Sequence, residues 1–410
     1  MKRIYFDHSA TTPVDQDVLN KMLPYFSEKF GNPSSIHTIG QIAMTGVDWA
    51  RSEASKFLHC ENEEVVFTSG STESNNLATR GLIKGLKKKL GDQKFHIITS
   101  VIEHDSILEP IAELERDGVE ITYIPVKSNG VIDLDFLNKS IKDNTVLISI
   151  MYVNSEVGSV QPIREIGKTV KKINEKRQKD WQNTLPNNRG EKPQPIYFHT
   201  DATQAINFFN CDVKYNYIDL LSLSAHKIYG PKGVGLLYAR KGVPIAALQL
   251  GGHHEGNRRS GTINSTGIIG LGHAIKKLTP KSIEKNNKQI STLRNALVDG
   301  IAKNIPNTVL NTDIKNSTPA HAHFSFLGVE GESILISLDL AGIAVSTGSA
   351  CASNSLKASH VLVAMGIMVE DAHSSIRFSL GKHTTIEEVN KLIKILPPII
   401  SRLRKMTPDL

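Results

Sequence analysis

Short apolar runs alternate with longer amphipathic stretches over the first two thirds of the chain. Most of these runs are continuously apolar, which is typical of parallel strands that helices cover on both faces. Stretches with helical spacing, such as 102–116 and 163–176, separate them. The pattern predicts an α/β fold with a mostly parallel sheet, whose ligands bind at the carboxyl ends of the strands. The seven predicted strands span residues 64–68, 95–100, 121–126, 146–153, 196–200, 218–223 and 234–239.

The pattern changes after about residue 262, where long helices and short strand-like runs follow one another. Helices are predicted at 265–278, 282–304 and 386–406, and short strands at 322–327, 343–346 and 375–378. We therefore expect a large domain over residues 16–263 and a smaller α+β domain formed by residues 1–15 and 264–410. The polar stretch 176–195, which contains three prolines, is expected to be a surface insertion or loop.

The composition indicates a globular protein and excludes several other classes. The 410 residues are 40% apolar and 22% charged, which is enough to bury a large core. The net charge is +7, but the lysines are scattered, so we expect no direct nucleic-acid binding. No apolar run approaches the roughly 18 residues of a membrane span, and the first residues lack the apolar core of a signal peptide. Three cysteines point to a reducing compartment, and we expect a cytoplasmic protein without a disulfide framework.

The most informative stretch is 219–240, where a predicted buried strand ends in Ser224-Ala225-His226-Lys227. A lysine beside small residues at the end of a buried strand can be desolvated, which favours the neutral amine that Schiff-base chemistry requires. A surface lysine at a strand end is the alternative interpretation.

Two further strand ends carry residues suited to the same pocket. Asp201 ends the predicted strand in IYFHTDATQ, where its carboxylate could pair with the ring nitrogen of pyridoxal phosphate (PLP) or cap a helix that begins at Ala202. The stretch VVFTSGSTESNN (65–76) ends a strand in Ser, Gly and Thr ahead of a helix. Such a turn could cradle a phosphate, although any capped helix start has the same letters. Together the three strand ends indicate a cofactor pocket.

Ten short blocks spread over nearly the whole chain carry a family resemblance. They are YFDHSATTPVD (5–15), FGNPSSIHTIG (30–40), TSGSTESNN (68–76), IEHDSI (102–107), VNSEVGSVQPI (153–163), HTDATQ (199–204), SAHKIYGPKGVG (224–235), RSGT (259–262), STGSACASNS (346–355) and SSIRFSLGKHTT (374–385). In this order they resemble the cysteine desulfurases of the iron–sulfur-cluster type, which are PLP-dependent class V aminotransferases. The resemblance implies the PLP-dependent transferase fold type I, with a seven-stranded, mostly parallel sheet in the large domain.

The resemblance implies roles for the residues that match the family's motifs. Lys227 would hold PLP covalently and later carry the substrate's α-proton, Asp201 would pair with the ring nitrogen, and Gln204 would bind the ring hydroxyl. His104 would stack on the ring face, although the residues alone favour a core or capping histidine. Thr262 would reach the phosphate of the opposite subunit in a homodimer. The remaining cofactor contacts would come from Ser71, Thr72, Asn154, Ser224 and His226.

Substrate binding and sulfur chemistry are assigned to other residues. Asn154 and Arg377 would orient the substrate, Arg377 through a bidentate contact with its carboxylate, although a surface arginine at a strand end is the alternative. Cys351 lies among small residues typical of a mobile loop and would be the nucleophile. Cys60 and Cys211 lie beside aromatic residues or leucine and are expected to be packed and inert.

The chain departs from the family's pattern at three positions that the PLP contacts do not use. Gly256 and Asn257 stand where an arginine and a glycine are usual, and Lys382 stands where an arginine is common. These departures bear on which sulfur acceptor the protein serves.

We therefore expect a cysteine desulfurase that converts L-cysteine to L-alanine and leaves a persulfide on Cys351 for an acceptor protein of cluster assembly or tRNA thiolation. No metal site is expected. A selenocysteine lyase or another class V PLP enzyme is the alternative activity. A protein that keeps the fold for binding or regulation without catalysis is the alternative of another class.

Overall fold

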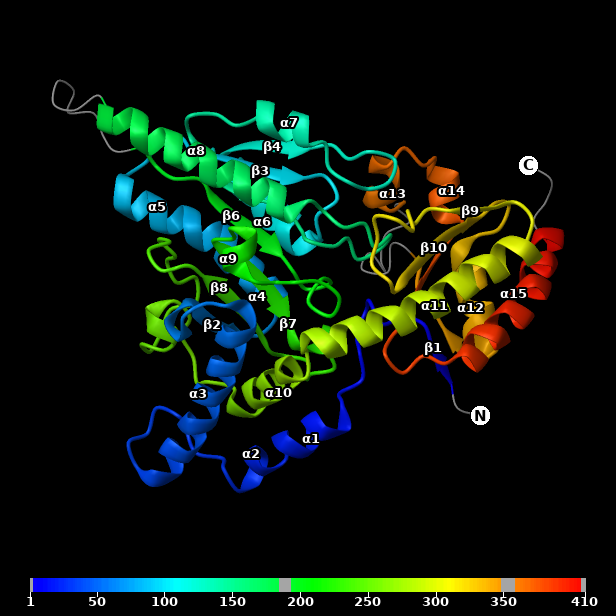
Figure 1. The fold of residues 1–410 in the computed structure, drawn as a ribbon, viewed down its shortest axis with the longest axis horizontal. Helices are drawn as coiled ribbons and strands as arrows, with labels where there is room; N and C mark the ends of the chain where they lie inside the picture. The colour runs from blue at the N-terminus through cyan, green and yellow to red at the C-terminus, as the bar shows by residue number, and fades with distance from the viewer. Residues whose placement is uncertain (1–2, 184–192, 348–357, 407–410) are drawn as a thin grey trace.

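The computed structural model describes residues 3–183, 193–347 and 358–406. Within these ranges a seven-stranded sheet forms the centre of the larger part of the molecule (Figure 1). The strand order is β2-β8-β7-β6-β5-β3-β4, and β8 alone among the seven runs antiparallel to its neighbours. The strands are β2 (Val65–Thr68), β3 (His96–Ser100), β4 (Glu120–Ile124), β5 (Thr145–Ser149), β6 (Tyr197–Asp201), β7 (Leu220–Ser224) and β8 (Gly235–Ala239). The predicted α/β fold is confirmed.

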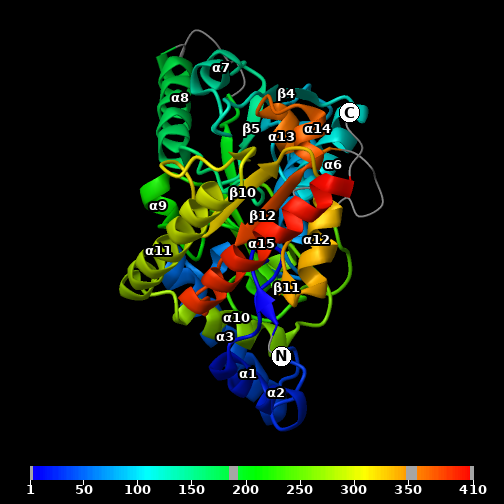
Figure 2. The same ribbon diagram turned by 90° about the vertical axis from the view of Figure 1, so that its right-hand side faces the viewer.

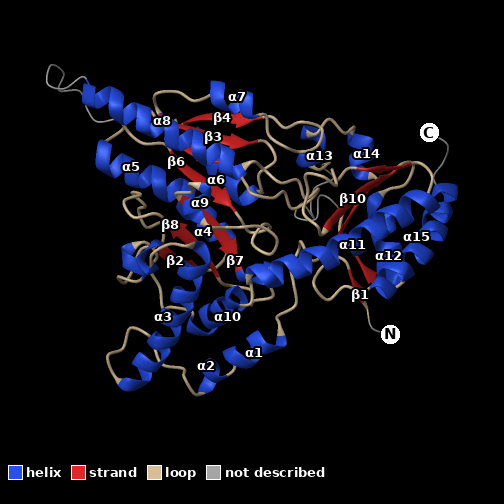
Figure 3. Cartoon of the chain, viewed as in Figure 1, coloured by secondary structure: helices blue, strands red, loops and turns tan. Residues whose placement is uncertain are grey.

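Helices cover both faces of this sheet (Figure 3). On one face, alternate strand residues such as Val66 and Ile97 pack against α5 (Leu82–Leu90) and α6 (Asp105–Arg116). On the other face, Phe67 and Ile98 share a core with α1 (Gln16–Met22), α3 (Thr38–Leu58), α8 (Ile163–Asn183) and α10 (Ser265–Lys276). Every residue of the strands other than the edge strand β4 is buried. This double burial explains the continuously apolar runs.

The rest of the described chain forms two small sheets with helices packed on them (Figure 2). One sheet is antiparallel with the order β12-β10-β9, and in the other β1 pairs in parallel with β11. Their strands are β1 (Ile4–Tyr5), β9 (Thr308–Leu310), β10 (His321–Phe326), β11 (Ile343–Ala344) and β12 (Ser375–Ser379). A separate apolar core lies between β10, β12 and the helices α11 (Pro280–Asn304), α12 (Gly331–Leu340) and α15 (Ile386–Met406). The start of the chain thus joins its C-terminal part.

The shorter elements connect these layers. They are α2 (Pro24–Ser27), α4 (Ser71–Asn76), α7 (Leu134–Lys139), α9 (Val213–Asn216), α13 (His360–Ala364), α14 (Val369–His373), the 3₁₀ turns η1 (Asn62–Glu64), η3 (Ala225–Lys227) and η4 (Glu255–Asn257), and the π turn η2 (Leu77–Gly81). The long helix α11 leads from the seven-stranded sheet to the small sheets (Figure 1). Helix α10 packs in the core of the larger sheet, so the predicted boundary at 263/264 precedes a helix of that core. The division into two domains stays a prediction.

Three local predictions differ from the structure. Helix α8 continues to Asn183, so residues 176–183 are helical and not loop. These polar residues form helix readily, and no proline lies between Pro162 and Pro186 to interrupt it. Strand β5 ends at Ser149, well before residue 153. The chain after Asp201 forms turns, and no helix begins at Ala202. None of the described helices combines the length and the apolar character that crossing a membrane requires.

Candidate active site

The carboxyl ends of the parallel strands bring most of the predicted site residues to one edge of the large sheet. Asp201 ends β6 and Ser224 ends β7, while His104 follows β3. Asn154 lies in the loop after β5, and Ser71 begins the helix after β2. The sheet therefore assembles residues that are far apart in the sequence, as parallel topology predicts.

Lys227 ends the 3₁₀ turn that follows β7, and the N-terminal segment of the chain wraps around it. Its Nζ donates to the backbone carbonyls of Ser9 and Ala10, the latter at 2.9 Å. Gln204 Nε2 also donates to the Ser9 carbonyl at 2.9 Å, and Thr12 Oγ1 donates to the carbonyl of His226 at 2.8 Å. Two carbonyl oxygens are good acceptors for an ammonium group, so this segment gives the Lys227 amine a defined position.

Asp201 is buried at the end of β6, and both of its carboxylate oxygens accept hydrogen bonds. Oδ1 accepts from the backbone N–H of Thr203 at 2.9 Å, and Oδ2 accepts from Nδ2 of Asn75 at 2.7 Å. Two residues earlier in the strand, burial lowers the pKa of His199 to about 4. His199 is therefore neutral at pH 7, and it bonds to the hydroxyls of Ser149 and Ser222. The buried strand that ends in Asp201 therefore carries a neutral histidine whose two ring nitrogens are both hydrogen-bonded.

His104 occupies the N-cap position of α6. Its Nδ1 accepts from the backbone N–H of Ser106 at 3.0 Å and lies 2.9 Å from the Ser106 hydroxyl. The capping function that the residues alone favour is therefore confirmed. Capping uses only Nδ1, so the stacking role implied by the resemblance is compatible with it and stays a prediction. The residue before His104 is Glu103, whose fully buried carboxyl accepts from the Met151 backbone N–H at 2.9 Å.

The proposed phosphate contacts come from the ends of two neighbouring segments. The backbone between β2 and α4 passes close to β7 and β8: a Cβ on Gly70 would lie 3.7 Å from Ser224 Oγ, and one on Gly235 only 2.7 Å from the Gly70 Cα. Only glycine permits so close an approach. Ser71 and Thr72 follow at the start of α4. Burial, with lesser contributions from two lysines, lowers the pKa of His226 to about 4.

Arg377 lies on β12 of the three-stranded sheet and reaches the loop after β5. It donates to the Ser155 carbonyl at 3.0 Å and to Asp7 Oδ1 at 2.7 Å. Its Nε is buried and has no hydrogen-bond partner among the described residues. The neighbouring Asn154 is buried, donates to the Ile102 carbonyl at 3.2 Å and accepts two backbone N–H groups. Arg377 is therefore a buried cation, and the interpretation as a surface arginine is wrong.

Two predicted site residues make none of the contacts described above. Thr262 is exposed in the loop that follows η4, and Cys351 lies outside the described residues. The other cysteines are placed: Cys211 is buried and Cys60 is partly buried. Burial raises the pKa of both thiols to about 12, so they are protonated and unreactive at pH 7, as predicted.

Sequence reasoning assigned no role to several residues of this edge. Asp7, Ser9 and Ala10 belong to the first block of the resemblance, and Asn75 and Ser106 belong to the third and fourth. Membership in these blocks was the only sequence feature that could have marked them as part of the site. Their contacts join segments distant in sequence, so no local pattern could assign them.

The three departures from the family's pattern have local explanations. Gly256 and Asn257 have φ angles of 62° and 63°, a left-handed conformation that glycine and asparagine tolerate best. Lys382 Nζ pairs with Asp15 at 2.6 Å and lies 4.0 Å from the centre of the Tyr229 ring. The departures are thus compatible with the observed backbone.

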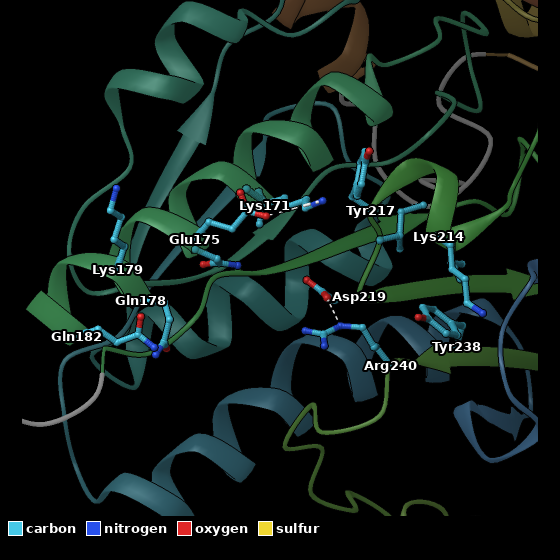
Figure 4. A pocket seen from close by; sticks show the side chains of 14 residues that line it. Lys171, Glu175, Gln178, Lys179, Gln182, Lys214, Tyr217, Asp219, Tyr238 and Arg240 are labelled. Carbon is cyan, nitrogen blue, oxygen red and sulfur yellow. Dashed lines mark hydrogen bonds and ion pairs between the residues drawn. The ribbon is translucent and has the colours of Figure 1, made fainter.

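A cavity of about 650 Å³ lies at the opposite edge of the sheet, between α8 and the ion pair of Asp219 and Arg240 (Figure 4). Asp219 directly precedes β7, whereas the candidate site lies where β7 ends. None of the predicted site residues lines this cavity. The candidate site is therefore separate from it.

Comparisons with known proteins agree with this arrangement. The family model "Aminotransferase class-V" matches residues 4–177 and 189–392. Cysteine desulfurase IscS of Dictyoglomus turgidum is 45% identical over 409 residues, which are 100% of this chain and 97% of that protein. Cysteine desulfurase IscS of Methanosarcina thermophila is 45% identical over 407 residues, which are 99% of this chain and 94% of that protein.

Solved structures show the same relationship. A NifS-like protein matches with a TM-score of 0.86 at 36% identity, over 98% of this chain and 100% of that one. The structure described as SspA in complex with cysteine matches with a TM-score of 0.77 at 34% identity, over 93% of this chain and 100% of that one. With the class V model and full-length relatives above 40% identity, the chain belongs to the class V aminotransferase family and, within it, to the cysteine desulfurases.

Proposed function

We propose that this protein converts L-cysteine to L-alanine with PLP as cofactor and keeps the sulfur as a persulfide on Cys351. The Cβ–Sγ bond of the substrate breaks, a new S–S bond forms at Cys351, and a proton replaces sulfur on Cβ. L-cysteine and one enzyme thiol thus give L-alanine and one persulfide, with atoms and electrons balanced. The observation that carries the proposal is the convergence of Lys227, Asp201 and His104 on one sheet edge that Arg377 approaches from the second sheet.

The residues at this edge fit PLP. The buried Asp201 would bind the ring nitrogen, His104 would face the ring, and Gln204 would bind the ring hydroxyl. The backbone of Gly70 passes close to Gly235 and lies near Ser224, and the phosphate would bind beside it at the start of α4. There Ser71, Thr72, Ser224 and His226 would contact it, with Asn154 near the ring. When bound, PLP supplies an electron sink that acidifies the Cα hydrogen of an attached amino acid.

Arg377 would bind the carboxylate of the substrate. A guanidinium has five N–H donors, and two are used by Ser155 and Asp7. The buried Nε has no partner among the described residues, and a buried donor without one is costly. A carboxylate that binds in the bidentate manner would satisfy it. Asn154 lies beside Ser155 in the loop after β5, and it would bind the substrate from the large sheet.

Lys227 would hold the cofactor and then carry the proton from Cα. Once its amine is free, the carbonyls of Ser9 and Ala10 can accept its N–H groups, as they do in the structure. These contacts would keep the amine near the substrate. The backbone of the N-terminal segment supplies these two acceptors.

Cys351 would take the sulfur and pass it to an acceptor protein of cluster assembly or tRNA thiolation. We further propose that the protein is a cytoplasmic homodimer in which Thr262 completes the phosphate site of the opposite subunit. The exposure of Thr262 supports this arrangement. The proposed division into domains, 16–263 against 1–15 with 264–410, would then place Lys227 and Cys351 on different units.

The test is an assay of purified protein with L-cysteine and a thiol reductant, in which sulfide and alanine are both measured. Equimolar products support the proposal. Lys227→Ala should lose the imine link to PLP that borohydride reduces, and all turnover with it, whereas Lys232→Ala, an exposed lysine of the same loop, should keep both. Turnover that depends on a keto acid would instead indicate an aminotransferase. Absence of PLP binding and of turnover would indicate a non-catalytic protein.

A further inference from the structure

Asn75 connects two of the proposed cofactor contacts, although the proposed mechanism gives it no role. It lies in α4, is fully buried, and donates through Nδ2 to Asp201 Oδ2 at 2.7 Å and to Ser106 Oγ at 2.8 Å. Ser106 Oγ lies 2.9 Å from Nδ1 of His104. Three hydrogen bonds in series therefore join the carboxylate at the ring nitrogen to the histidine at the ring face.

The hydrogen positions along this series follow from groups that can act in one way only. Asn75 donates through Nδ2 to both Asp201 and Ser106, so its two amide hydrogens are both used. Ser106 Oγ accepts one of them, which leaves its own hydrogen for His104. The backbone N–H of Ser106 also donates to His104 Nδ1 at 3.0 Å. Nδ1 therefore carries no hydrogen, and neutral His104 carries its hydrogen on Nε2.

We propose that Asn75 is a positioning residue that holds Asp201 and His104 as one unit against the cofactor ring. This rests on the proposed function, because it assumes that PLP binds between these two groups. Asn75 acts through its donors, since its Oδ1 is buried without a partner among the described residues. That unpaired oxygen lowers stability, which is expected where a residue is selected for function.

Asn75→Ala removes both donors, and its effect is measured first on PLP binding to cofactor-free protein. The PLP dissociation constant should rise by roughly 10- to 100-fold, since a hydrogen bond to a charged group is lost at Asp201. The matched control is Asn311→Ala. Asn311 is also buried and also donates to two side chains, Ser325 at 2.9 Å and His323 at 3.1 Å, but in the three-stranded sheet. The control should lose stability and keep PLP affinity.

Asn75→Asp gives a signature that a merely structural asparagine would not give. The introduced carboxyl is nearly isosteric but cannot donate when ionised, and it would face Asp201 with a second negative charge. As the pH falls, the pair takes up one proton, which restores a donor between them. PLP affinity of this variant should therefore recover toward wild type with falling pH, whereas wild-type affinity should lack this recovery. Asn75→Ala, which cannot regain a donor, should show none either.

The tautomer of His104 is a second readout and needs neither cofactor nor activity. Nitrogen-15 NMR of cofactor-free wild-type protein should show His104 neutral with its hydrogen on Nε2. A hydrogen on Nδ1 would overturn the proposed series even if PLP binds normally. Unchanged PLP affinity in Asn75→Ala, or equal losses in Asn75→Ala and Asn311→Ala, would overturn the positioning role. Failure of wild-type protein to bind PLP would instead contradict the proposed function, while the NMR result would still decide the hydrogen-bond series.

Discussion

At the scale of single residues, the two cysteines that the structure describes, Cys60 and Cys211, are poor sources of a thiolate. Burial raises the pKa of Cys60 and Cys211 to about 12, so neither supplies a nucleophile near neutral pH. A sulfur acceptor must be a thiolate, because only this group is soft and nucleophilic enough to take Sγ of the substrate. Cys351 is therefore the remaining candidate by elimination as well as by family motif.

Cys351→Ala should separate cofactor binding from sulfur transfer. The variant should bind PLP and L-cysteine but lose alanine production by several orders of magnitude, as expected when a nucleophile is removed from a catalytic unit. Cys211→Ala is the control and should keep activity, with a loss of stability at most. After a pulse of L-cysteine, mass tagging of wild-type protein should place the extra sulfur on Cys351. Alanine release at the wild-type rate by Cys351→Ala would point to a lyase without a protein persulfide.

Glu103 predicts a pH dependence of stability. Burial, with a smaller contribution from Asp201, raises its pKa to about 8, against an ordinary value of 4.5 for a glutamic acid. Between pH 4.5 and pH 8, the folded protein therefore keeps the Glu103 proton, whereas the unfolded chain has released it. Folding is then linked to proton binding, so this residue's contribution to the free energy of unfolding falls as the pH rises from 4.5 toward 8.

Glu103→Gln should abolish that contribution. Glutamine keeps an acceptor for the Ser100 hydroxyl and the Met151 N–H, but it does not titrate. Its stability relative to wild type should rise with pH by up to about 1.4 kcal/mol per unit, measured by urea unfolding of cofactor-free protein. Glu120→Gln is the control, because Lys142 lowers the pKa of this exposed carboxyl and it does not titrate in this window. Parallel pH profiles for wild type and Glu103→Gln would contradict the prediction.

At the scale of elements, two ion pairs attach the 251–262 segment to the large sheet. Arg51 on α3 makes a bidentate contact with Glu255, at 2.9 and 2.6 Å, and the Phe67 backbone N–H donates to the same carboxylate at 2.8 Å. Arg259 pairs with Glu73 of α4 at 2.9 Å. The segment that ends in Thr262 is thereby fixed next to the helix that begins the proposed phosphate cradle.

Glu255→Gln should be strongly destabilising, because it leaves the Arg51 charge without its partner. The Glu255 side chain is 3% exposed, and breaking a buried pair costs roughly 3–5 kcal/mol. Glu113→Gln breaks another Arg–Glu pair, with Arg80, but these side chains are 43% and 40% exposed. That control should lose less than about 1 kcal/mol. Urea unfolding measures the free energy of unfolding of the two variants. Equal decreases would contradict the prediction that the buried Glu255 pair stabilises the fold more than the exposed Glu113 pair.

At the scale of the whole molecule, the proposed homodimer would share its phosphate site between two subunits. Thr262 is exposed in its own chain, so its hydroxyl is available to a second subunit. A site that takes Thr262 from the opposite subunit would use this exposed hydroxyl. Each subunit would then complete the site of the other, and neither would be active alone.

Mixing two inactive variants tests this sharing. A heterodimer of Lys227→Ala and Thr262→Ala chains would contain one site with both lesions and one site with neither. Activity should return to about half of the wild-type value per heterodimer, if subunits exchange and the site is shared as in a symmetric dimer. Mixed chains that carry both substitutions serve as the control and should stay inactive. Demonstrated exchange without any regained activity would argue against a shared site.

Much of the fold was predictable because it depends on local patterns. Strands buried on both faces require continuous apolar runs, and β2, β3, β6, β7 and β8 lie within one or two residues of their predicted bounds. Helix α15 matches its predicted range fully. Errors arose where no local pattern marks an end, as where α8 extends to Asn183 and β5 stops at Ser149.

The site residues, like the fold, were predictable where a local pattern marks them and not where packing decides their contacts. The sequence by itself determined that Lys227, Asp201 and the 65–76 stretch lie at strand ends, and parallel strands end at a common edge. Only the tertiary structure decided what these groups contact. Arg377 meets Asp7 across 370 residues, and Asn75 meets Asp201 across 126. Such contacts depend on how separate elements pack, and packing joins side chains that share no periodicity or spacing along the chain.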